Sequence, residues 1–275
     1  MGDDNWMQAW HPAVPGVREV LHARMTDHAY PPHVHADWAI LLVDEGAVAY
    51  ELGGRARIAD ASAVTLLPPG VAHDGRAAPQ SSGFRKRVAY LHASWMPEGR
   101  AGRIVDQPSR IDLVPAARRA HRALATPGEE LAAEAILLAL ASRLATDVSE
   151  NLRDTPDSTV ARRLRDLLEA HLVDGITLAQ AGRLLGAHPG HLARAFATEF
   201  GAPPHRYVTS RRVDLARRLL LDGATPASVA VKAGFYDQAH LTRHFRKVLG
   251  TTPGRFAAAH GKSQAGIAES EGPVT

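Results

Sequence analysis

Hydrophobic residues change their spacing partway along the chain. Residues 38–52 and 56–73 are rich in Val, Ile, Leu and Tyr and are broken by glycine-containing turn pairs, which is typical of β-strands. Closely spaced strands of this kind predict an antiparallel barrel or sandwich within residues 14–95. After residue 113 the apolar residues recur at helical spacing, so the sequence predicts an α+β chain whose strands come first.

Two helices are predicted directly after the strands, at 113–126 and 129–150. In the second helix, positions 131, 135, 138, 142 and 145 form one stripe, which Ile136, Leu137 and Leu140 widen. A wide apolar face on a helix can be buried in a core or can pair with a second copy of the chain. The pattern leaves both interpretations open.

A polar stretch at 149–159 predicts a linker, and every segment after it has helical spacing. The longest of these helices is expected at 204–222, where it begins with a proline and stops before Gly223. We therefore predict three parts: a cupin-like strand domain at 10–112, a helical linker or dimerisation region at 113–150, and a helical domain at 159–260.

The last part contains the same unit twice. GHLARAFATEFGAPPHRY at 190–207 and AHLTRHFRKVLGTTPGRF at 239–256 share a His-Leu-x-Arg-x-Phe core followed by a glycine and a proline. In each copy the Leu and the Phe lie at i and i+4 and share a buried helix face, whereas the Arg between them points outward. A short helix, a glycine turn and such a second helix predict a helix-turn-helix, whose second helix enters the major groove of DNA.

Charge favours the same interpretation. The net charge is only +3, but residues 159–262 hold 16 Lys and Arg against 7 Asp and Glu, and a basic half favours an anionic partner. A helix at 204–222 is about 28 Å long, which can hold two recognition helices near the spacing of successive major grooves, about 34 Å. We expect arginines on or beside this helix to meet phosphates, namely Arg211, Arg212, Arg217 and Arg218, although some of them could be solvated and Arg212 could equally pack between the two units.

The two predicted recognition helices differ on their outer faces. The second presents residue types that read base edges, namely Gln238, Ala239, Thr242, Arg243 and Arg246. The first presents smaller residues around one arginine, namely Gly190, Ala193, Arg194 and Ala197. We therefore expect the second copy to read bases and the first to contact mainly the phosphate backbone.

GFYDQAHLTRHFRKVLGTTPGRF at 234–256, with RRVDLARRLLLDG before it, resembles the AraC/XylS family of bacterial transcription regulators. The resemblance covers about 100 residues, and it implies DNA contacts at Gly190, Ala193, Arg194, Gln238, Ala239, Thr242 and Arg243. Two residues depart from the family pattern. His188 stands where a Ser usually caps the helix, and Gly182 stands where a small Ala usually packs.

The histidines of the first half also resemble a known pattern. PPHVHADW at 31–38 and PPGVAH at 68–73 are similar to the two motifs of a cupin barrel, which AraC/XylS regulators often carry as an effector-binding domain. The resemblance implies that His33, His35 and His73 face one cavity. Metal-binding cupins usually place a Glu where this chain has Ala39 and Ile40, so no metal or other cofactor is favoured.

We expect a small-molecule pocket lined by His33, His35, Trp38 and His73, although these histidines could instead hold a divalent metal or be structural. Further candidates for the pocket walls are Tyr50, Tyr90, His92 and Trp95. Each of them could equally belong to the core.

These patterns predict a sequence-specific DNA-binding transcription regulator, controlled by a small-molecule effector and not an enzyme. The expected partners are double-stranded DNA, the effector, a second copy of the chain and RNA polymerase, with no membrane. The alternative is a cupin metalloenzyme of the dioxygenase or isomerase type with a helical extension. The chain has no cysteine and no evident signal peptide or membrane span, so a cytoplasmic location is expected.

Overall fold

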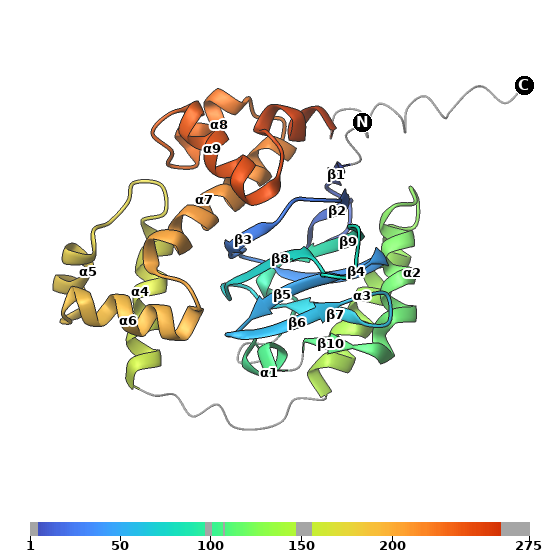
Figure 1. The fold of residues 1–275 in the computed structure, drawn as a ribbon, viewed down its shortest axis with the longest axis horizontal. Coiled ribbons are helices and arrows are strands. Elements are labelled where there is room, and N and C mark those ends of the chain that lie inside the picture. Colours follow the sequence, from blue (N-terminus) through green and yellow to red (C-terminus); the bar gives the residue numbers. More distant parts are fainter. Residues whose placement is uncertain (1–4, 97–100, 107, 147–155, 260–275) are drawn as a thin grey trace, which may run out of the picture.

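The structure is a computed structural model that describes residues 5–96, 101–106, 108–146 and 156–259 (Figure 1). Most of the predicted linker lies outside these ranges, and a helix already begins at Pro156. The first half is built from β-strands, in chain order β1 (Trp6–Trp10), β2 (Val17–Met25), β3 (Tyr30–His33), β4 (Trp38–Gly46), β5 (Val48–Leu52), β6 (Arg55–Ala59), β7 (Val64–Leu67), β8 (His73–Ala77), β9 (Phe84–Leu91) and β10 (Ser109–Arg110).

The strands form two antiparallel sheets. One has the order β1-β2-β9-β4-β7-β10 and the other the order β3-β8-β5-β6. In the part of the chain that the structure describes, the sheets are not hydrogen-bonded into a closed barrel. The β5–β6 hairpin turns at Gly53 and Gly54, both with positive φ, and this backbone matches the twist of the strands that it joins.

Residues on β4 and β9 alternate between the two faces of the larger sheet. Ala39 and Leu41 face inward, toward the smaller sheet, whereas Ile40 and Leu42 belong to a second core on the outer face. Trp38 lies in that outer core and is 3% exposed. The expectation that Trp38 lines a ligand pocket is therefore wrong, because its place in the alternation puts its ring on the opposite side of the sheet.

The helices follow in chain order: α1 (Ala101–Asp106), α2 (Val114–Leu124), α3 (Glu130–Thr146), α4 (Pro156–Ala170), α5 (Leu178–Leu185), α6 (Pro189–Phe200), α7 (Pro204–Leu221), α8 (Pro226–Lys232) and α9 (Gln238–Leu249). Short 3-10 turns occupy Ala93–Trp95 and Ile111–Leu113, and a last short helical segment covers residues 253–259. Among the described residues, no helix is long and apolar enough to cross a membrane.

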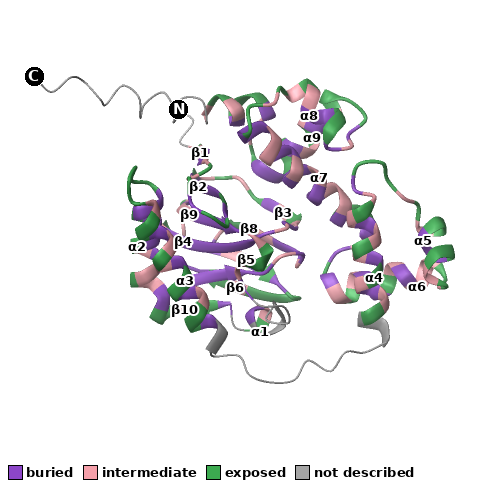
Figure 2. Ribbon diagram, turned by 180° about the vertical axis from the view of Figure 1, so that it is seen from behind, coloured by how far each residue is buried: buried purple, intermediate pink, exposed green. Residues whose placement is uncertain are grey.

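Helices α2 and α3 cover the outer face of the six-stranded sheet, with their outer sides exposed (Figure 2). The buried side of α3 is made by Ala133, Leu137, Leu140 and Leu144. The stripe predicted from the sequence runs along the exposed side instead, where Leu131 and Leu138 are 79% and 61% exposed. An apolar residue on each side explains why the sequence pattern could not assign the core face.

The second half contains the two predicted helix-turn-helix units, α5–α6 and α8–α9, joined by α7 (Figure 1). Local sequence explains where their first helices begin. Thr177 caps α5 through a capping box with Gln180, and Thr225 caps α8 ahead of Pro226. These features confirm an α+β fold with a β domain ahead of a doubled helix-turn-helix.

Candidate DNA interface and ligand cavity

Helix α9 is amphipathic around its long axis. The Asp237 side chain caps it by accepting a hydrogen bond from His240 N at 2.6 Å. Leu241 and Phe245 are fully buried, which fixes the rotation of the helix. The predicted base-reading residues therefore face solvent: Gln238, Ala239, Arg243 and Arg246 are exposed and Thr242 is half-buried.

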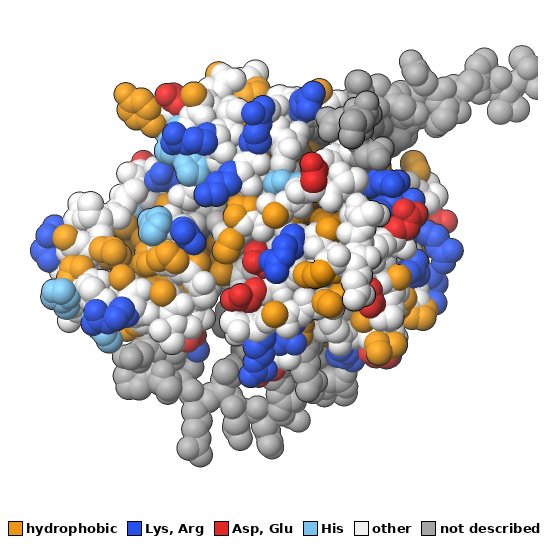
Figure 3. All heavy atoms as spheres, in the orientation of Figure 1, with side chains coloured by type: hydrophobic (Ala, Val, Ile, Leu, Met, Phe, Trp, Pro, Cys, Tyr) orange, Lys and Arg blue, Asp and Glu red, His pale blue; other side chains and the backbone are white. Residues whose placement is uncertain are grey.

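The exposed face of α9 carries positive charge. Together with Lys247, the five predicted residues line one shallow depression. Within the described ranges, Arg243, Arg246 and Lys247 form no ion pair with an acidic side chain. Figure 3 shows Lys and Arg side chains over the α8–α9 unit. Uncompensated cations on a helix face suit the phosphates and guanine edges of DNA.

Helix α6 presents a smaller face. His188 acts as its N-cap, since its ring Nδ1 accepts a hydrogen bond from Gly190 N at 3.1 Å. Arg194 is exposed, whereas Gly190 and Ala193 are half-buried. A side-chain carbon at position 190 would lie 3.3 Å from Nδ1 of His188, so the glycine leaves room for the capping imidazole at the helix start.

Two of the four α7 arginines expected to meet phosphates are buried, and Arg218 is half-buried with its Nη2 3.9 Å from Asp214. Arg211 and Arg217 are 6% and 5% exposed. Arg212 donates hydrogen bonds to the carbonyl oxygens of Leu172 and Val173 and so packs between the two units. The sequence shows that α7 is rich in arginine but cannot show that acidic residues lie opposite.

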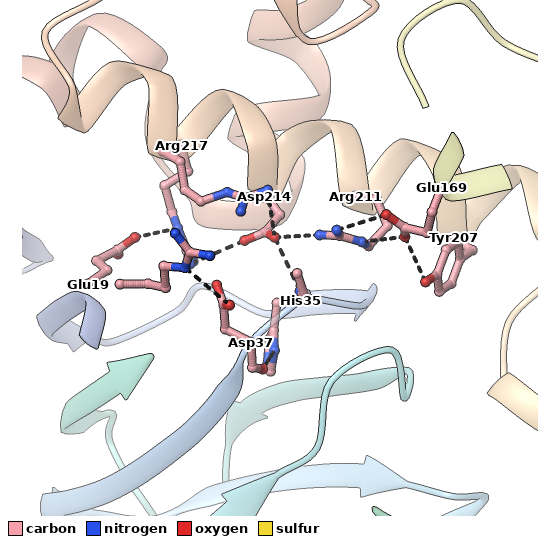
Figure 4. Close-up of polar contacts among 11 residues, drawn as sticks. Glu19, His35, Asp37, Glu169, Tyr207, Arg211, Asp214 and Arg217 are labelled. Atoms are coloured by element: carbon pink, nitrogen blue, oxygen red, sulfur yellow. Dashed lines mark hydrogen bonds and ion pairs between the residues drawn. The ribbon is translucent and has the colours of Figure 1, made fainter. Parts of the chain in front are cut away.

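Arg211 and Arg217 belong to a buried chain of ion pairs between the two halves of the protein (Figure 4). Arg217 Nε lies 2.8 Å from Oε2 of Glu19 on β2, and Arg217 Nη2 lies 3.3 Å from Asp214. Arg211 continues the chain, with its Nη1 2.6 Å from Asp214 and its Nε 2.7 Å from Glu169 on α4.

Burial shapes the ionisation of this chain. It raises the pKa of Glu19 to about 7, although Arg217 acts in the opposite direction. Burial also opposes ionisation of Asp214, but three neighbouring arginines, led by Arg217, outweigh it and hold the pKa of Asp214 below its usual value. Asp214 also accepts a hydrogen bond from Ala36 N at 3.3 Å. The ion-pair chain and this hydrogen bond thus connect α7 to the β domain.

A cavity of about 50 Å³ lies inside the β domain, beneath α7 and α9. Its walls include the three predicted histidines, the predicted Tyr90, two side chains that were not predicted (Tyr30 and Lys86), and two residues of the helical half. They are His33, His35, His73, Tyr30, Tyr90, Lys86, Arg217 and Leu249. Tyr50 also lines the cavity as predicted, whereas Trp95 packs against the outer core; His92 instead caps the turn at Ala93–Trp95.

The three histidines have their ring nitrogens arranged alike. In each ring Nδ1 lies 2.6 to 3.0 Å from a backbone carbonyl two residues away, so Nδ1 carries the hydrogen and Nε2 is left as an acceptor. Burial lowers the pKa of His35 to about 3 and of His73 to about 4, and it also lowers that of His33. All three rings are therefore neutral at neutral pH.

Sequence analysis missed Tyr30, Lys86 and Arg217 as cavity residues, and Lys86 is the charged side chain that β9 contributes. Lys86 lies on the same face of β9 as Phe84, Val88 and Tyr90, because side chains two residues apart on a strand point the same way. This period of two was the signal that could have identified it. Its Nζ lies 3.9 Å from the centre of the Tyr30 ring, and within the described residues no carboxylate pairs with it. Burial, and then Arg217, lower the pKa of Lys86 to about 7.

Metal binding is not supported at the histidines. The rings of His33 and His35 lie 4.5 and 4.8 Å from that of His73, but no three metal-ligating side chains in the described part of the chain are placed to hold an ion.

Comparison with known proteins agrees with this architecture. The family model described as an AraC-like ligand binding domain matches residues 15–141, and the model described as a helix-turn-helix domain matches residues 181–259. YbfI, an uncharacterized HTH-type transcriptional regulator of Bacillus subtilis, is 29% identical over 48% of this chain and 49% of its own length. The virulence regulon transcriptional activator VirF of Yersinia enterocolitica is 30% identical over 43% of each chain.

The chain thus spans about half or less of the length of these relatives. A structure of ToxT from Vibrio cholerae with an unsaturated fatty acid bound aligns with a TM-score of 0.58 and 11% identity, over 93% of this chain and 95% of ToxT. That likeness concerns the fold. The relatives are named as transcription regulators, so the metalloenzyme alternative is not supported.

A ligand-binding β domain, two helix-turn-helix units on one connecting helix and the matches to both domains lead to one assignment: the chain belongs to the AraC/XylS family of transcription regulators.

Proposed function

We propose that the chain binds specific DNA sequences through α6 and α9 and that α9 makes most of the contacts to bases. The observation that carries this proposal is the solvent-facing set on α9, where Gln238, Arg243 and Arg246 have no competing acidic partner among the described residues. Gly190, Ala193 and Arg194 on α6 supply a close approach to the backbone with a single charged contact.

Selection of bound sequences from a random DNA pool with the full chain tests this function. We expect a recovered site with two conserved boxes about one helical turn apart, one for each recognition helix. Recovery of a single box, or of no sequence preference at all, would contradict the assignment of two reading helices.

We propose that the effector is a small organic acid whose carboxylate binds Lys86 and Arg217. Lys86 has no carboxylate partner within the described residues, and Tyr30 Oη, which can donate to a carboxylate, is buried without a hydrogen-bond partner. An unpaired buried polar group costs about 1–3 kcal/mol, so a ligand that pairs with these atoms gains binding energy. The fatty acid in the ToxT structure is also a carboxylic acid.

The apolar part of such an acid needs more room than the cavity now has. Its volume of about 50 Å³ suits a carboxylate head group, whereas pockets for small molecules usually measure about 300 Å³ or more. The strand walls are held by sheet hydrogen bonds, while Arg217 and Leu249 come from the helical half. Ligand entry should therefore shift the helical half relative to the β domain.

A panel of straight-chain carboxylic acids and their methyl esters tests this proposal by thermal shift of the full chain. The acids should raise the Tm and the uncharged esters should not. Lys86→Met should abolish the shift, whereas Lys232→Met on the exposed side of α8 should retain it. Equal shifts by acids and esters would contradict the assigned carboxylate site.

We further propose that the chain forms a homodimer through the exposed stripe of α3, which contains Leu131 and Leu138. Leu138→Arg should convert the dimer to a monomer in sedimentation velocity, and Leu184→Arg, at another exposed leucine on α5, should not. RNA polymerase remains an expected partner, and a DNA target implies a cytoplasmic location.

A further inference from the structure

The β domain contacts the end of the first recognition helix. Ala72 N, in the loop before β8, donates a hydrogen bond to the carbonyl of Phe200, the last residue of α6, at 3.2 Å. Gly201 follows as the helix C-cap with φ of +72°. A side-chain carbon placed at Gly201 would lie 3.5 Å from Cβ of Ala72, so the two backbones are in close contact.

The same domain contacts the end of the second recognition helix. His28, in the loop between β2 and β3, has its Nε2 3.4 Å from the carbonyl oxygen of Val248 near the end of α9. Gly250 caps that helix with φ of +73°. A side-chain carbon at Gly250 would lie only 2.9 Å from Cγ of His28, so a glycine is required for the imidazole to fit.

The two contacts occupy equivalent places in the repeated unit. Gly201 and Gly250 correspond in the two copies, and each donates its N–H to the carbonyl four residues back in its own helix. The loops that touch them also border the ligand cavity. Ala72 precedes the cavity residue His73, and the His28 ring lies edge-on to Tyr30 with centroids 4.6 Å apart.

We propose that His28 and Ala72 are positioning residues for DNA recognition. The two loops that carry them, called the rim of the β domain below, hold the ends of both recognition helices and thereby set the spacing between the two DNA boxes that the protein accepts. This inference rests on the proposed reading of DNA by α6 and α9. Helix α7 joins the two units from one side, and the rim is a second connection that fixes their relative orientation. A change at the cavity wall then alters spacing preference before it alters base preference.

The chain has no cysteine, so a single engineered pair can test the first contact. The separation of 3.5 Å at Ala72 and Gly201 lies within the Cβ–Cβ range of disulfides, about 3.5–4.5 Å. The double variant Ala72→Cys/Gly201→Cys can be compared with itself in oxidised and reduced form, which removes any effect of the substitutions on folding. His28→Ala tests the second contact, with thermal unfolding as the measure of folding.

The readout is affinity of the full chain for its selected site and for copies with one or two base pairs inserted between the boxes. His28→Ala should reduce the preference for native spacing by roughly fivefold, with base preference within each box unchanged. Oxidation of the cysteine pair should increase that preference relative to the reduced form.

The inference is overturned if neither change alters the spacing profile while the parent protein binds its selected site. It is also overturned if the oxidised form binds no site that the reduced form binds, because the rim would then hold α6 away from DNA. If the parent protein selects no sequence at all, both the proposed function and this inference fail.

Discussion

The two helix-turn-helix units share a scaffold and one outward arginine, Arg194 or Arg243, but differ in the residues around it. Leu192 and Leu241 are both fully buried, and Gly201 and Gly250 end their helices with φ within one degree of each other. The outer faces, by contrast, place several base-reading side chains on α9 and essentially one, Arg194, on α6. Residues that build the unit are thus repeated, whereas residues that determine the DNA sequence read by each copy have diverged.

The buried leucines test whether the scaffolds are equal. Leu192→Ala and Leu241→Ala should each lower the free energy of unfolding by about 2–5 kcal/mol, since each removes a fully buried side chain. Denaturant titration measures both, and Leu184→Ala at an exposed site should cost little. A large effect in only one unit would mean that the two cores are not equivalent.

The C-cap glycines test whether the contacts with the β domain are equal. Ala at either position meets the same left-handed backbone, which costs about 1–2 kcal/mol. Gly250→Ala should cost more than Gly201→Ala, because its added carbon would lie 2.9 Å from the His28 ring instead of 3.5 Å from Ala72. The comparison is made by thermal unfolding, and adding His28→Ala should remove the excess cost.

The outward arginines test the difference in DNA reading. Arg243→Ala should lose about 1–3 kcal/mol of binding to the selected site and relax the preference at one base pair. Arg194→Ala should weaken all sequences alike and reduce the slope of affinity against salt concentration by about one. Quantitative binding to the selected and scrambled sites distinguishes the two. Equal loss of base preference in both variants would contradict unequal reading.

The buried pair of Glu19 and Arg217 contributes a dependence of stability on pH. The pKa of Glu19 is raised from 4.5 to about 7 by burial, so between these values the folded protein binds more protons than the unfolded chain. Stability contributed by this group is therefore present below pH 4.5 and is lost as the pH rises toward 7. Glu19→Gln should remove this slope, which urea titrations of both proteins between pH 5 and 7 can measure; identical slopes would contradict it.

Sequence reasoning found the features that depend on neighbours along the chain. The repeated helices, their capping residues Thr177 and Thr225, and the outward residues of α9 all follow from local spacing. It also brought His33, His35 and His73 to one cavity through their motifs. Trp38 was misplaced because a pattern of continuous apolar residues on β4 does not reveal which face each side chain takes.

Features that depend on contacts between distant segments could not be predicted. Arg211 and Arg217 resemble phosphate-binding residues until Glu19 and Glu169, which lie far away in sequence, are seen to neutralise them. The position of Lys86 in the cavity also depends on contacts between distant segments. Its charge belongs to the cavity only because β9 pairs between β2 and β4 and turns that side of the strand inward.

One hydrophobic core includes Leu41 and Val88 of the β domain together with Phe245 and Leu249 of α9. The boundary between the two domains in sequence is therefore not a boundary in folding. The full chain should unfold in one cooperative heat-absorption peak, whereas a fragment containing only the helical half would expose apolar surface and tend to aggregate. Experiments that isolate either half would thus measure a different protein from the one in which the halves are joined.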